Sequence, residues 1–591
     1  MPKFFRRAAL ASTAFLIAVA AFHAATGYGL INCDDYDYLL NHPEVTGGLT
    51  LGGIRWAFAN MQEAIWMPLT WISYMTDYSL GLGYGGMHAV SILIHGLNTI
   101  LLFLFLSRLF PKHNSLLILA ATLIWAIHPL RVESVVWLAS RKDVLSTFFF
   151  LLALLAWIAP SPPSSPIPHP HSSLFTLNSS LFILLGAAAK PSVMVFPVFA
   201  VLIDLLILRR RKPWWAYAVI ILLSLGIAIE ASIAQKVGGA MDATLAIPLW
   251  YRLVNAVAAL TVYLGNFILP LDLAPQCLLR YPDLPRFSLI GAIALLALAF
   301  WIYKLLAPVL RTLHSSLTLH SSLIVLTFFF SLIPFLGLVG FGVHAFADRF
   351  TLLPSLGLSL FLLTLIPSFP IPHPNSSLFT LHFSLFALPL LALCAFFALR
   401  TTIQVGYWAN DGFLFDHTAA MDGESNAKAL ANAAKYYYEF EHDLQKTHDR
   451  LARALKGRNG LAEVGHLGDL YMEAAFVVKD KADMDDCIGW LAKWDYWESE
   501  RMKVESGNYA DCHSIPYAAA EILRLASKPD LYDTATNRFE QLRRNLPRHH
   551  TVRVLAYRLA EVKGDPQEIA ARRAELSDTD DDLYMRNRWA R

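Results

Sequence analysis

Residues 88–109 of the chain read HAVSILIHGLNTILLFLFLSRL, and Arg108 is the only charged side chain among them. An α-helix needs about 20 mostly apolar residues to cross the ~30 Å hydrocarbon core of a membrane. We therefore predict that this stretch is a membrane-spanning helix. Its polar residues His88, His95 and Asn98 are separated by seven and three positions, which places them near one face of that helix.

The same pattern recurs through most of the first 400 residues. The first apolar segment follows a short basic N-terminus and lacks a convincing cleavage site, so we interpret it as a retained helix rather than a signal peptide. Residues 250–269 are also apolar, but Arg252 and Asn255 interrupt them, and we interpret this stretch as interfacial or re-entrant. The remaining segments predict eleven spans, near 8–25, 88–109, 115–130, 142–159, 174–189, 192–208, 214–232, 287–307, 321–338, 351–367 and 380–399.

Composition divides the chain into two parts. Asp, Glu, Lys and Arg number 36 in residues 1–400 (9%), and the other 58 of the 94 lie in residues 401–591 (30%). Soluble domains are about one quarter charged. The predicted fold is all-α, with a polytopic membrane helical bundle over 1–405 and a soluble helical domain over 406–591. A net charge of +2 gives no electrostatic reason to expect nucleic acid as a partner.

The positions of basic residues predict the orientation of the bundle. Positive charges concentrate in the cytoplasmic loops of membrane proteins. With eleven spans the loop 27–86, the loop near 131–141, the region 233–286 and the tail all face outward. The basic residues that then share the cytoplasmic side are Lys3, Arg6, Arg7, Arg108, Lys112, Arg209, Arg210, Arg211, Lys212, Lys304 and Arg311.

The tail shows helical periodicity over 427–440, 461–478, 517–526 and 534–546. A degenerate tetratricopeptide-like array and an irregular helical domain fit this pattern equally well. Cys487 and Cys512 could pair if the tail is in an oxidising compartment, but the five cysteines show no metal-site spacing. A repeated segment, at 167–182 and 371–386 with an echo at 314–323, is interpreted as a low-complexity insertion without chemistry.

The first outward loop begins with an acidic pair, in the run Asn-Cys-Asp-Asp-Tyr-Asp-Tyr of residues 32–38. Adjacent carboxylates repel each other, and a raised pKa on one of them suits a general base. A solvated acidic turn is the alternative. Asp34 and Asp35 are therefore candidates for catalysis, and the pattern does not show which of them is the base.

Ionisable residues gather near the outward ends of the predicted helices, where they mark pathways or sites more often than lipid contacts. The alternative is snorkelling of long side chains at the interface. Several such residues on one side indicate a polar cavity facing outward. The candidates are His95, His128, Arg131, Glu133, Arg141, Lys142, Lys190, Gln235, Arg252, Asp348 and Arg349.

Cations that face a carboxylate pair at a membrane surface suit a lipid-phosphate substrate. Arg and Lys stabilise a phosphate leaving group, while a carboxylate can deprotonate an incoming hydroxyl. This combination favours glycosyl transfer from a polyprenyl-phosphate sugar. A lipid-linked sugar flippase and a non-catalytic envelope scaffold are the alternatives, although transporters usually place polar residues at the midplane between inverted repeats.

Several motifs occur in an order that resembles a known family. They include the runs beginning at Trp66, His88, His128 and Arg141, then Ala189-Lys-Pro191, Ala234-Gln-Lys-Val-Gly-Gly239, the stretch 263–270, Ala347-Asp-Arg-Phe-Thr-Leu-Leu-Pro-Ser355 and Trp408…Asp411…Phe415. Over about residues 30–415 the chain resembles bacterial relatives of the transmembrane and tetratricopeptide-repeat O-mannosyltransferases, within the type C glycosyltransferase superfamily. Met67 departs from the His or Arg usual at that position.

The resemblance implies a multi-pass enzyme of the bacterial inner membrane, with a cytoplasmic N-terminus and a periplasmic C-terminal domain. It implies that Asp34 and Asp35, with Glu133, form the catalytic group, and that His128, Arg131, Arg141, Lys142 and Arg349 surround the donor phosphate. The expected donor is a polyprenyl-phosphate-linked mannose or other hexose, and the expected acceptor is a protein or glycan. Membrane lipids are also expected partners. No cofactor is identified, and a divalent cation at the acidic pair is an open alternative.

Overall fold

The computed structural model describes residues 3–61, 63–159, 170–238, 248–271, 327–338, 344–365, 377–421, 427–441, 528–545 and 550–577. Isolated residues between 241 and 278, 443 and 453, and 522 and 526 are also described. The chain divides into two compact units, Met1–Leu414 and Phe415–Arg591. Each is taken by itself below.

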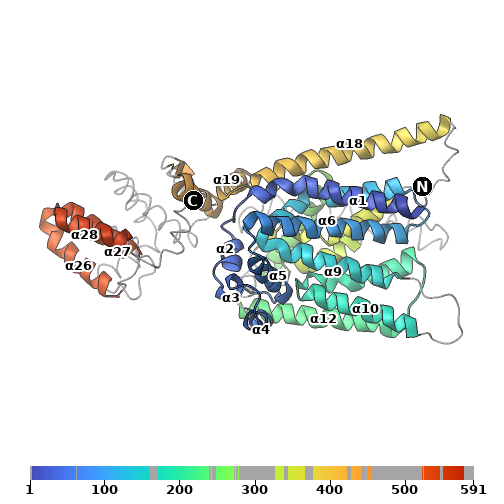
Figure 1. Ribbon diagram of the computed structural model, residues 1–591, viewed down its shortest axis with the longest axis horizontal. Helices are drawn as coiled ribbons and strands as arrows, with labels where there is room; N and C mark the ends of the chain where they lie inside the picture. The colour runs from blue at the N-terminus through green and yellow to red at the C-terminus, as the bar shows by residue number, and fades with distance from the viewer. Residues whose placement is uncertain are drawn as a thin grey trace. The chain divides into compact units, whose positions relative to one another are not determined.

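Five long apolar helices form the body of the first unit: α1 (Lys3–Phe22), α6 (Tyr84–Leu109), α9 (Arg141–Trp157), α10 (Pro170–Ala187) and α12 (Trp214–Val237). Figure 1 shows them side by side, and α1 packs on α6, α6 on α9, and α9 on α10. Gly96 of α6 permits one close approach, because a Cβ there would lie 2.7 Å from the Phe15 ring of α1. Helices can approach this closely only where one of them carries a small residue.

Short helices gather at one end of this body, which we call the loop end (Figure 1): α2 (Asp34–Leu39), α3 (Pro43–Thr46), α4 (Leu51–Ala59) and α5 (Pro68–Ser79). Further helices complete the unit. They are α7 (Ser115–Ala126), α8 (Val132–Val136), α11 (Phe196–Leu202), α14 (Leu249–Ile268), α17 (Pro354–Leu365), α18 (Ser377–Tyr407) and α19 (Asp411–Met421), whose last residues belong to the second unit.

Turns of 3-10 and π type join these helices, at η1 (His23–Gly27), η2 (Pro129–Arg131), η3 (Leu138–Ser140), η4 (Pro191–Val195), η5 (Ile203–Ile207), η6 (Ile333–Phe335) and η7 (Asp348–Thr351). Strands β1 (Cys277–Leu278) and β2 (His344–Phe346) form one short antiparallel pair, with Cys277 opposite Phe346 and Leu278 opposite His344. For the described residues, the all-helical prediction is confirmed apart from this pair.

Four described helical segments are long and apolar enough to cross a membrane: Phe5–Gly27, Tyr84–Leu109, Trp214–Val237 and Pro389–Tyr407. A fifth results if Ser115–Ala126 and Pro129–Val136, which meet at 53°, form one broken span. These segments mark the chain as a multi-pass membrane protein. The predicted span 287–307 and residues 321–326 of the span 321–338 lie outside the described residues, so the number eleven stays a prediction. Residues 249–268 form one continuous helix despite Arg252 and Asn255.

The opposite end of the body carries the basic residues of three helix ends, and we call it the basic end. Arg6 and Arg7 lie at the start of α1, Arg108 lies at the end of α6, and residues 209–212 immediately precede α12. Asp204 holds the last of these segments in place, because its buried carboxylate accepts hydrogen bonds from Arg210 Nε (2.8 Å), Trp157 Nε1 (3.0 Å) and the Tyr217 hydroxyl (3.0 Å). These basic residues therefore share one end of the bundle, as the charge pattern requires.

The second unit contains the remainder of α19, then α20 (Ala427–Tyr436), η8 (Tyr437–Glu441), η10 (Pro529–Leu531), α26 (Tyr532–Asn545), α27 (His550–Lys563) and α28 (Pro566–Ser577). α26 packs on α27 and α27 on α28. The helices expected over 427–440 and 534–546 are present, while 461–478, most of 517–526, Cys487 and Cys512 lie outside the described residues. A tetratricopeptide-like array stays a prediction.

Candidate active site

The acidic pair opens α2 at the loop end. Asp35 is fully buried, and its two carboxylate oxygens accept backbone hydrogen bonds from different parts of the chain. Oδ2 accepts from Ile31 N at 2.9 Å, and Oδ1 accepts from Ala139 N at 2.7 Å. Asp35 therefore joins the first loop to η3, which immediately precedes α9.

Burial raises the pKa of Asp35 to about 7, because a carboxylate loses hydration there. The two backbone N–H groups lower the pKa, whereas the negative charges of Asp34 and Asp411 raise it further. Asp411 lies at the start of α19 and accepts a hydrogen bond from Asn32 N at 2.7 Å. Three carboxylates thus surround the turn of residues 31–35.

Asp34 differs from its neighbour because it is partly exposed. Its charge acts on two buried cations, Lys142 and Arg349. Lys142 Nζ donates to Ala139 O (2.9 Å) and to the Tyr38 hydroxyl (3.2 Å), and it lies 4.4 Å from the centre of the Tyr38 ring. An ammonium group has three N–H donors, so the contacts with described residues leave one for a ligand.

Arg349 and Glu133 form a buried ion pair. Arg349 N donates to Glu133 Oε2 at 2.8 Å, and Arg349 Nη1 donates to Glu133 Oε1. Burial alone would lower the pKa of Arg349, but the carboxylates of Glu133, Asp34 and Asp143 raise it above its ordinary value. The guanidinium group therefore stays charged and lies 5.3 Å from the centre of the Trp137 ring.

Lys190 and Asp143 form a second buried pair, with Nζ 2.5 Å from Oδ1. Among the residues that the structure describes, the other carboxylate oxygen, Asp143 Oδ2, has no protein partner. Both residues line a small cavity beside Arg349, with a volume of about 10 Å³. That volume accommodates about one water molecule, which could hydrogen-bond to the free oxygen.

Arg141 is buried at the same end of α9, but protein groups occupy its donors. Nη1 pairs with Asp77 and also reaches Ser73 Oγ, Nε donates to Ser91 Oγ (3.2 Å), and Nη2 donates to Met87 O (2.8 Å). The guanidinium also lies 4.7 Å from the centre of the Tyr74 ring. These contacts fix α5 and α6 against α9.

Three further predicted residues are bound to backbone or hydroxyl groups nearby. Arg131 donates to Ser355 Oγ and Thr351 Oγ1, each at 3.0 Å. His128 contacts Phe267 O through Nε2 (2.9 Å) and accepts from Leu130 N through Nδ1 (3.2 Å), while His95 contacts Ala126 O through Nε2 (2.8 Å). Asp348 is also buried and interacts through its charge with Glu133 and Arg131.

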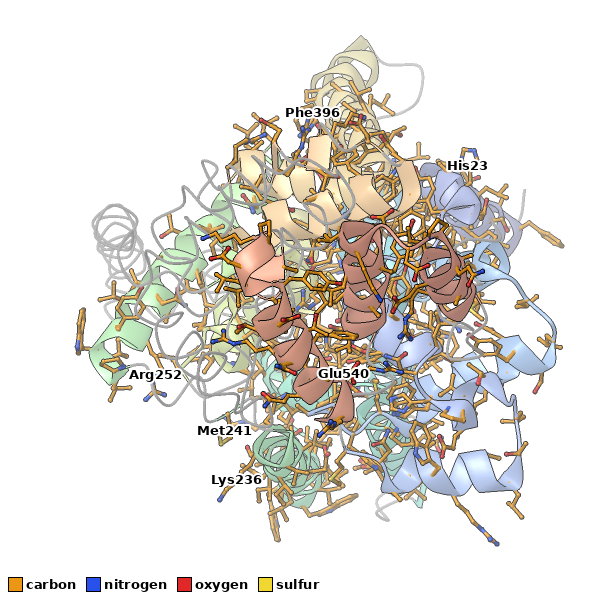
Figure 2. The ribbon with its side chains drawn as sticks, turned by 90° about the vertical axis from the view of Figure 1, so that its left-hand side faces the viewer. His23, Lys236, Met241, Arg252, Phe396 and Glu540 are labelled. Atoms are coloured by element: carbon orange, nitrogen blue, oxygen red, sulfur yellow. The ribbon has the colours of Figure 1, made fainter. Side chains whose placement is uncertain are left out.

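Two predicted residues contact other parts of the unit. Gln235 Nε2 donates to Ala64 O at 2.7 Å, which links α12 to the first loop. Arg252 Nη1 donates to Leu338 O at 2.7 Å, and Figure 2 shows Arg252 at the periphery of the bundle. The structure thus brings together Asp34, Asp35, Glu133, Lys142, Lys190 and Arg349, while Arg131, Arg141, His95 and His128 support their surroundings.

Three contributors were not among the predicted site residues: Tyr38, Asp77 and Asp411. Tyr38 contacts Lys142, Asp77 neutralises Arg141, and Asp411 holds the acidic turn through Asn32. Asp411 lies within the last stretch of the family-like motifs, which was the one signal that could have identified it. Within the described residues, no group of three or more His, Cys, Asp or Glu side chains is arranged to hold a metal ion.

The raised pKa of Asp35 predicts a pH-dependent stability. The unfolded chain releases this proton near pH 4, whereas the folded protein releases it near pH 7. Because the folded state binds the proton more tightly, its free energy of unfolding falls as pH rises from 4 to 7 and levels off above. A shift of this size corresponds to on the order of 4 kcal/mol. Thermal unfolding of detergent-solubilised protein at pH 4–8 should show a weaker decline for Asp35→Asn, and equal declines would contradict the assignment.

Comparison with known proteins supports the resemblance. Protein O-mannosyl-transferase TMTC4 of Mus musculus is 29% identical over 180 residues, which cover 26% of this chain and 24% of that protein. TMTC1 of Mus musculus is 32% identical over 136 residues, covering 21% of this chain and 14% of that protein. Tmtc1 of Drosophila melanogaster is 29% identical over 161 residues, covering 25% and 18%.

The matched region therefore spans less than a quarter of each of these relatives. No family model matches the chain, and no solved structure matches it. The similarity is that of a distant relative, and it supports a membrane glycosyltransferase in general terms.

Proposed function

We propose that this distant relative of the protein O-mannosyl-transferases is an inverting glycosyltransferase of the bacterial inner membrane. It transfers mannose or another hexose from a polyprenyl phosphate to a hydroxyl group on the periplasmic side, most simply that of a protein. The loop end is then periplasmic and the basic end cytoplasmic. The C-terminal domain, residues 406–591, is periplasmic as well.

The observation that carries this proposal is the arrangement of Asp34 with Lys142 and Arg349. A partly exposed carboxylate acts on two buried cations, and glycosyl transfer from a lipid phosphate needs both kinds of charge. The carboxylate accepts the proton of the incoming hydroxyl, while the cations stabilise the negative charge of the departing phosphate. Cations held by the protein before reaction stabilise developing charge without reorganisation.

In the proposed reaction, Asp34 accepts the proton of the acceptor hydroxyl as its oxygen attacks the anomeric carbon of the sugar. The bond between that carbon and the phosphate oxygen breaks, and its electron pair leaves with the polyprenyl phosphate. Lys142 and Arg349 bind the leaving phosphate, and Glu133 orients Arg349. Attack opposite to the leaving group inverts the anomeric centre.

Asp35 has a different role in this proposal. Its two oxygens already hold Ile31 N and Ala139 N, and its side chain is fully buried. It positions Asp34 relative to Lys142, because Ala139 lies in η3 and its carbonyl oxygen also accepts from Lys142. Arg141 is a positioning residue for the same reason, since its donors bind protein groups.

Comparative mass spectrometry tests the function. Glycoproteins and surface glycans are analysed from a deletion strain, the strain complemented with wild type, and the strain complemented with Asp34→Asn. We expect a hexose-bearing product that is lost in the deletion and in Asp34→Asn and restored by wild type. Identical glycan and glycoprotein profiles in all three strains would contradict the proposal and favour a scaffold, whereas accumulation of a lipid-linked sugar on the cytoplasmic face without loss of transfer in extracts would favour a flippase.

A further inference from the structure

Five tryptophans among the described residues of the first unit are fully or almost fully buried, and they differ in how their indole N–H groups are satisfied. Trp125 Nε1 donates to Leu352 O at 3.2 Å, and Trp157 Nε1 donates to Asp204 Oδ2 at 3.0 Å. Within the described parts of the chain, no protein acceptor is found for the Nε1 atoms of Trp71, Trp137 and Trp408. Trp157 lies at the basic end and Trp125 lies 5.7 Å from Arg131, whereas Trp137 lies beside Lys142 and Arg349.

An indole nitrogen can only donate a hydrogen bond. A buried donor without an acceptor costs free energy, and folded proteins rarely tolerate it. The fold supplies acceptors to Trp125 and Trp157, where the indole has a structural role. Unsatisfied indole donors beside the site are therefore expected to meet an acceptor that the protein itself does not provide.

Trp137 and Trp408 are next to each other, with ring centres 6.0 Å apart. Trp137 also lies 5.3 Å from the Arg349 guanidinium and 5.8 Å from Lys142 Nζ. Trp137 thus lies beside both cations, and Trp408 lies beside Trp137. A group of N–H donors and cations suits an acceptor rich in oxygen and negative charge.

Both tryptophans belong to segments that hold the acidic turn. Trp137 directly precedes η3, whose Ala139 N binds Asp35. Trp408 lies three residues before Asp411, which binds Asn32 N. A ligand bound by these indoles would thus be held by the same backbone that positions Asp34 and Asp35.

We propose that the indole N–H groups of Trp137 and Trp408 donate hydrogen bonds to phosphate oxygens of the lipid donor, between Lys142 and Arg349. The inference rests on the proposed function and adds two specificity residues to it. Each indole offers one N–H donor in a fixed direction and therefore selects for the position of a phosphate oxygen. Lys142 and Arg349 contribute positive charge. Sugar hydroxyl oxygens would satisfy the same donors, and the experiment distinguishes these sources.

Equilibrium binding of radiolabelled farnesyl phosphate to the full chain in nanodiscs tests the proposal. Farnesol, which lacks the phosphate, is the competitor control. The variants are Trp137→Phe and Trp408→Phe, and Trp157→Phe is the matched control, because it also removes a buried indole N–H but at the other end of the bundle. We expect Trp137→Phe and Trp408→Phe each to weaken farnesyl phosphate binding by at least about tenfold, with farnesol binding unchanged. Trp157→Phe should bind like wild type and unfold at a lower temperature.

Replacement of Trp137 or Trp408 by benzothienylalanine keeps the ring shape and removes only the N–H, which covers the case in which Phe prevents folding. Wild-type affinity in these sulfur-containing variants would overturn the inference while leaving the proposed function intact. Equal loss of farnesyl phosphate and farnesol binding would also overturn it, since that result indicates a packing role. Wild-type protein that prefers farnesyl phosphate no more than farnesol would overturn the proposed function and the inference together.

Discussion

Asp34→Asn is expected to reduce sugar transfer by about 10²–10⁴-fold, the usual contribution of a positioned general base. The amide cannot accept the proton of the acceptor hydroxyl at neutral pH, although its size is unchanged. Asp34 is partly exposed, and its carboxylate has no hydrogen bond to the other described residues. The amount of folded protein should therefore remain near that of wild type. Transfer is measured in membranes that supply a polyprenyl-phosphate sugar, with protein quantified in the same samples.

Two neighbouring variants make this result specific. Asp37→Asn lies on the same short helix, where Asp37 is exposed and accepts from Asn41 Nδ2 at 2.7 Å. It should transfer at the wild-type rate. Asp35→Asn should lower activity, because its amide group must turn a donor toward either Ile31 N or Ala139 N and thereby disturb the turn that carries Asp34. Normal transfer by Asp34→Asn would show that the base lies elsewhere.

The membrane body could be predicted from the sequence because hydrophobic length alone decides whether a helix can span. Residues 88–109 became part of α6, which runs from Tyr84 to Leu109, and the basic residues of three helix ends share one end of the bundle. Internal helix boundaries were harder to predict. The stretch 192–208 is apolar apart from Ser192 and Asp204, yet it contains a 3-10 turn, a short helix and a π-helical turn. Asp204 lies in the π-helical turn and contacts Trp157 and Tyr217.

The sequence predicted which residues form the site better than it predicted the role of each residue. The sequence places Asp34 and Asp35 side by side, and both are equally good candidates for the catalytic base. Their difference arises from Ala139, which is 104 positions away from Asp35 and binds only that carboxylate. Likewise, neither the pairing of Glu133 with Arg349 nor the contact of Asp411 with Asn32 has a local signal, since 216 and 379 positions separate the partners.

Arg141 and Lys142 were equivalent candidates in the sequence, and the structure gives opposite expectations for them. Arg141→Met removes the only cation that is seen to pair with buried Asp77 among the described residues. Loss of one partner from a buried ion pair costs about 3–5 kcal/mol, so the variant should be strongly destabilised or absent from membranes. Arg141→Lys should recover part of that stability, because it restores the charge but cannot reach Ser91 Oγ and Met87 O at once.

Lys142→Met should instead leave a folded protein that binds its donor poorly. The substitution removes two hydrogen bonds, to Ala139 O and to the Tyr38 hydroxyl, but the methionine side chain keeps the buried volume and no carboxylate loses its one close partner. We expect donor binding to weaken by about 10–100-fold, as for a lost hydrogen bond to a charged group. Thermal unfolding and donor titration of both variants separate the two roles. A stable Arg141→Met with weak donor binding, beside an unstable Lys142→Met, would reverse the assignment, because the fold would then depend on the lysine and the phosphate on the arginine.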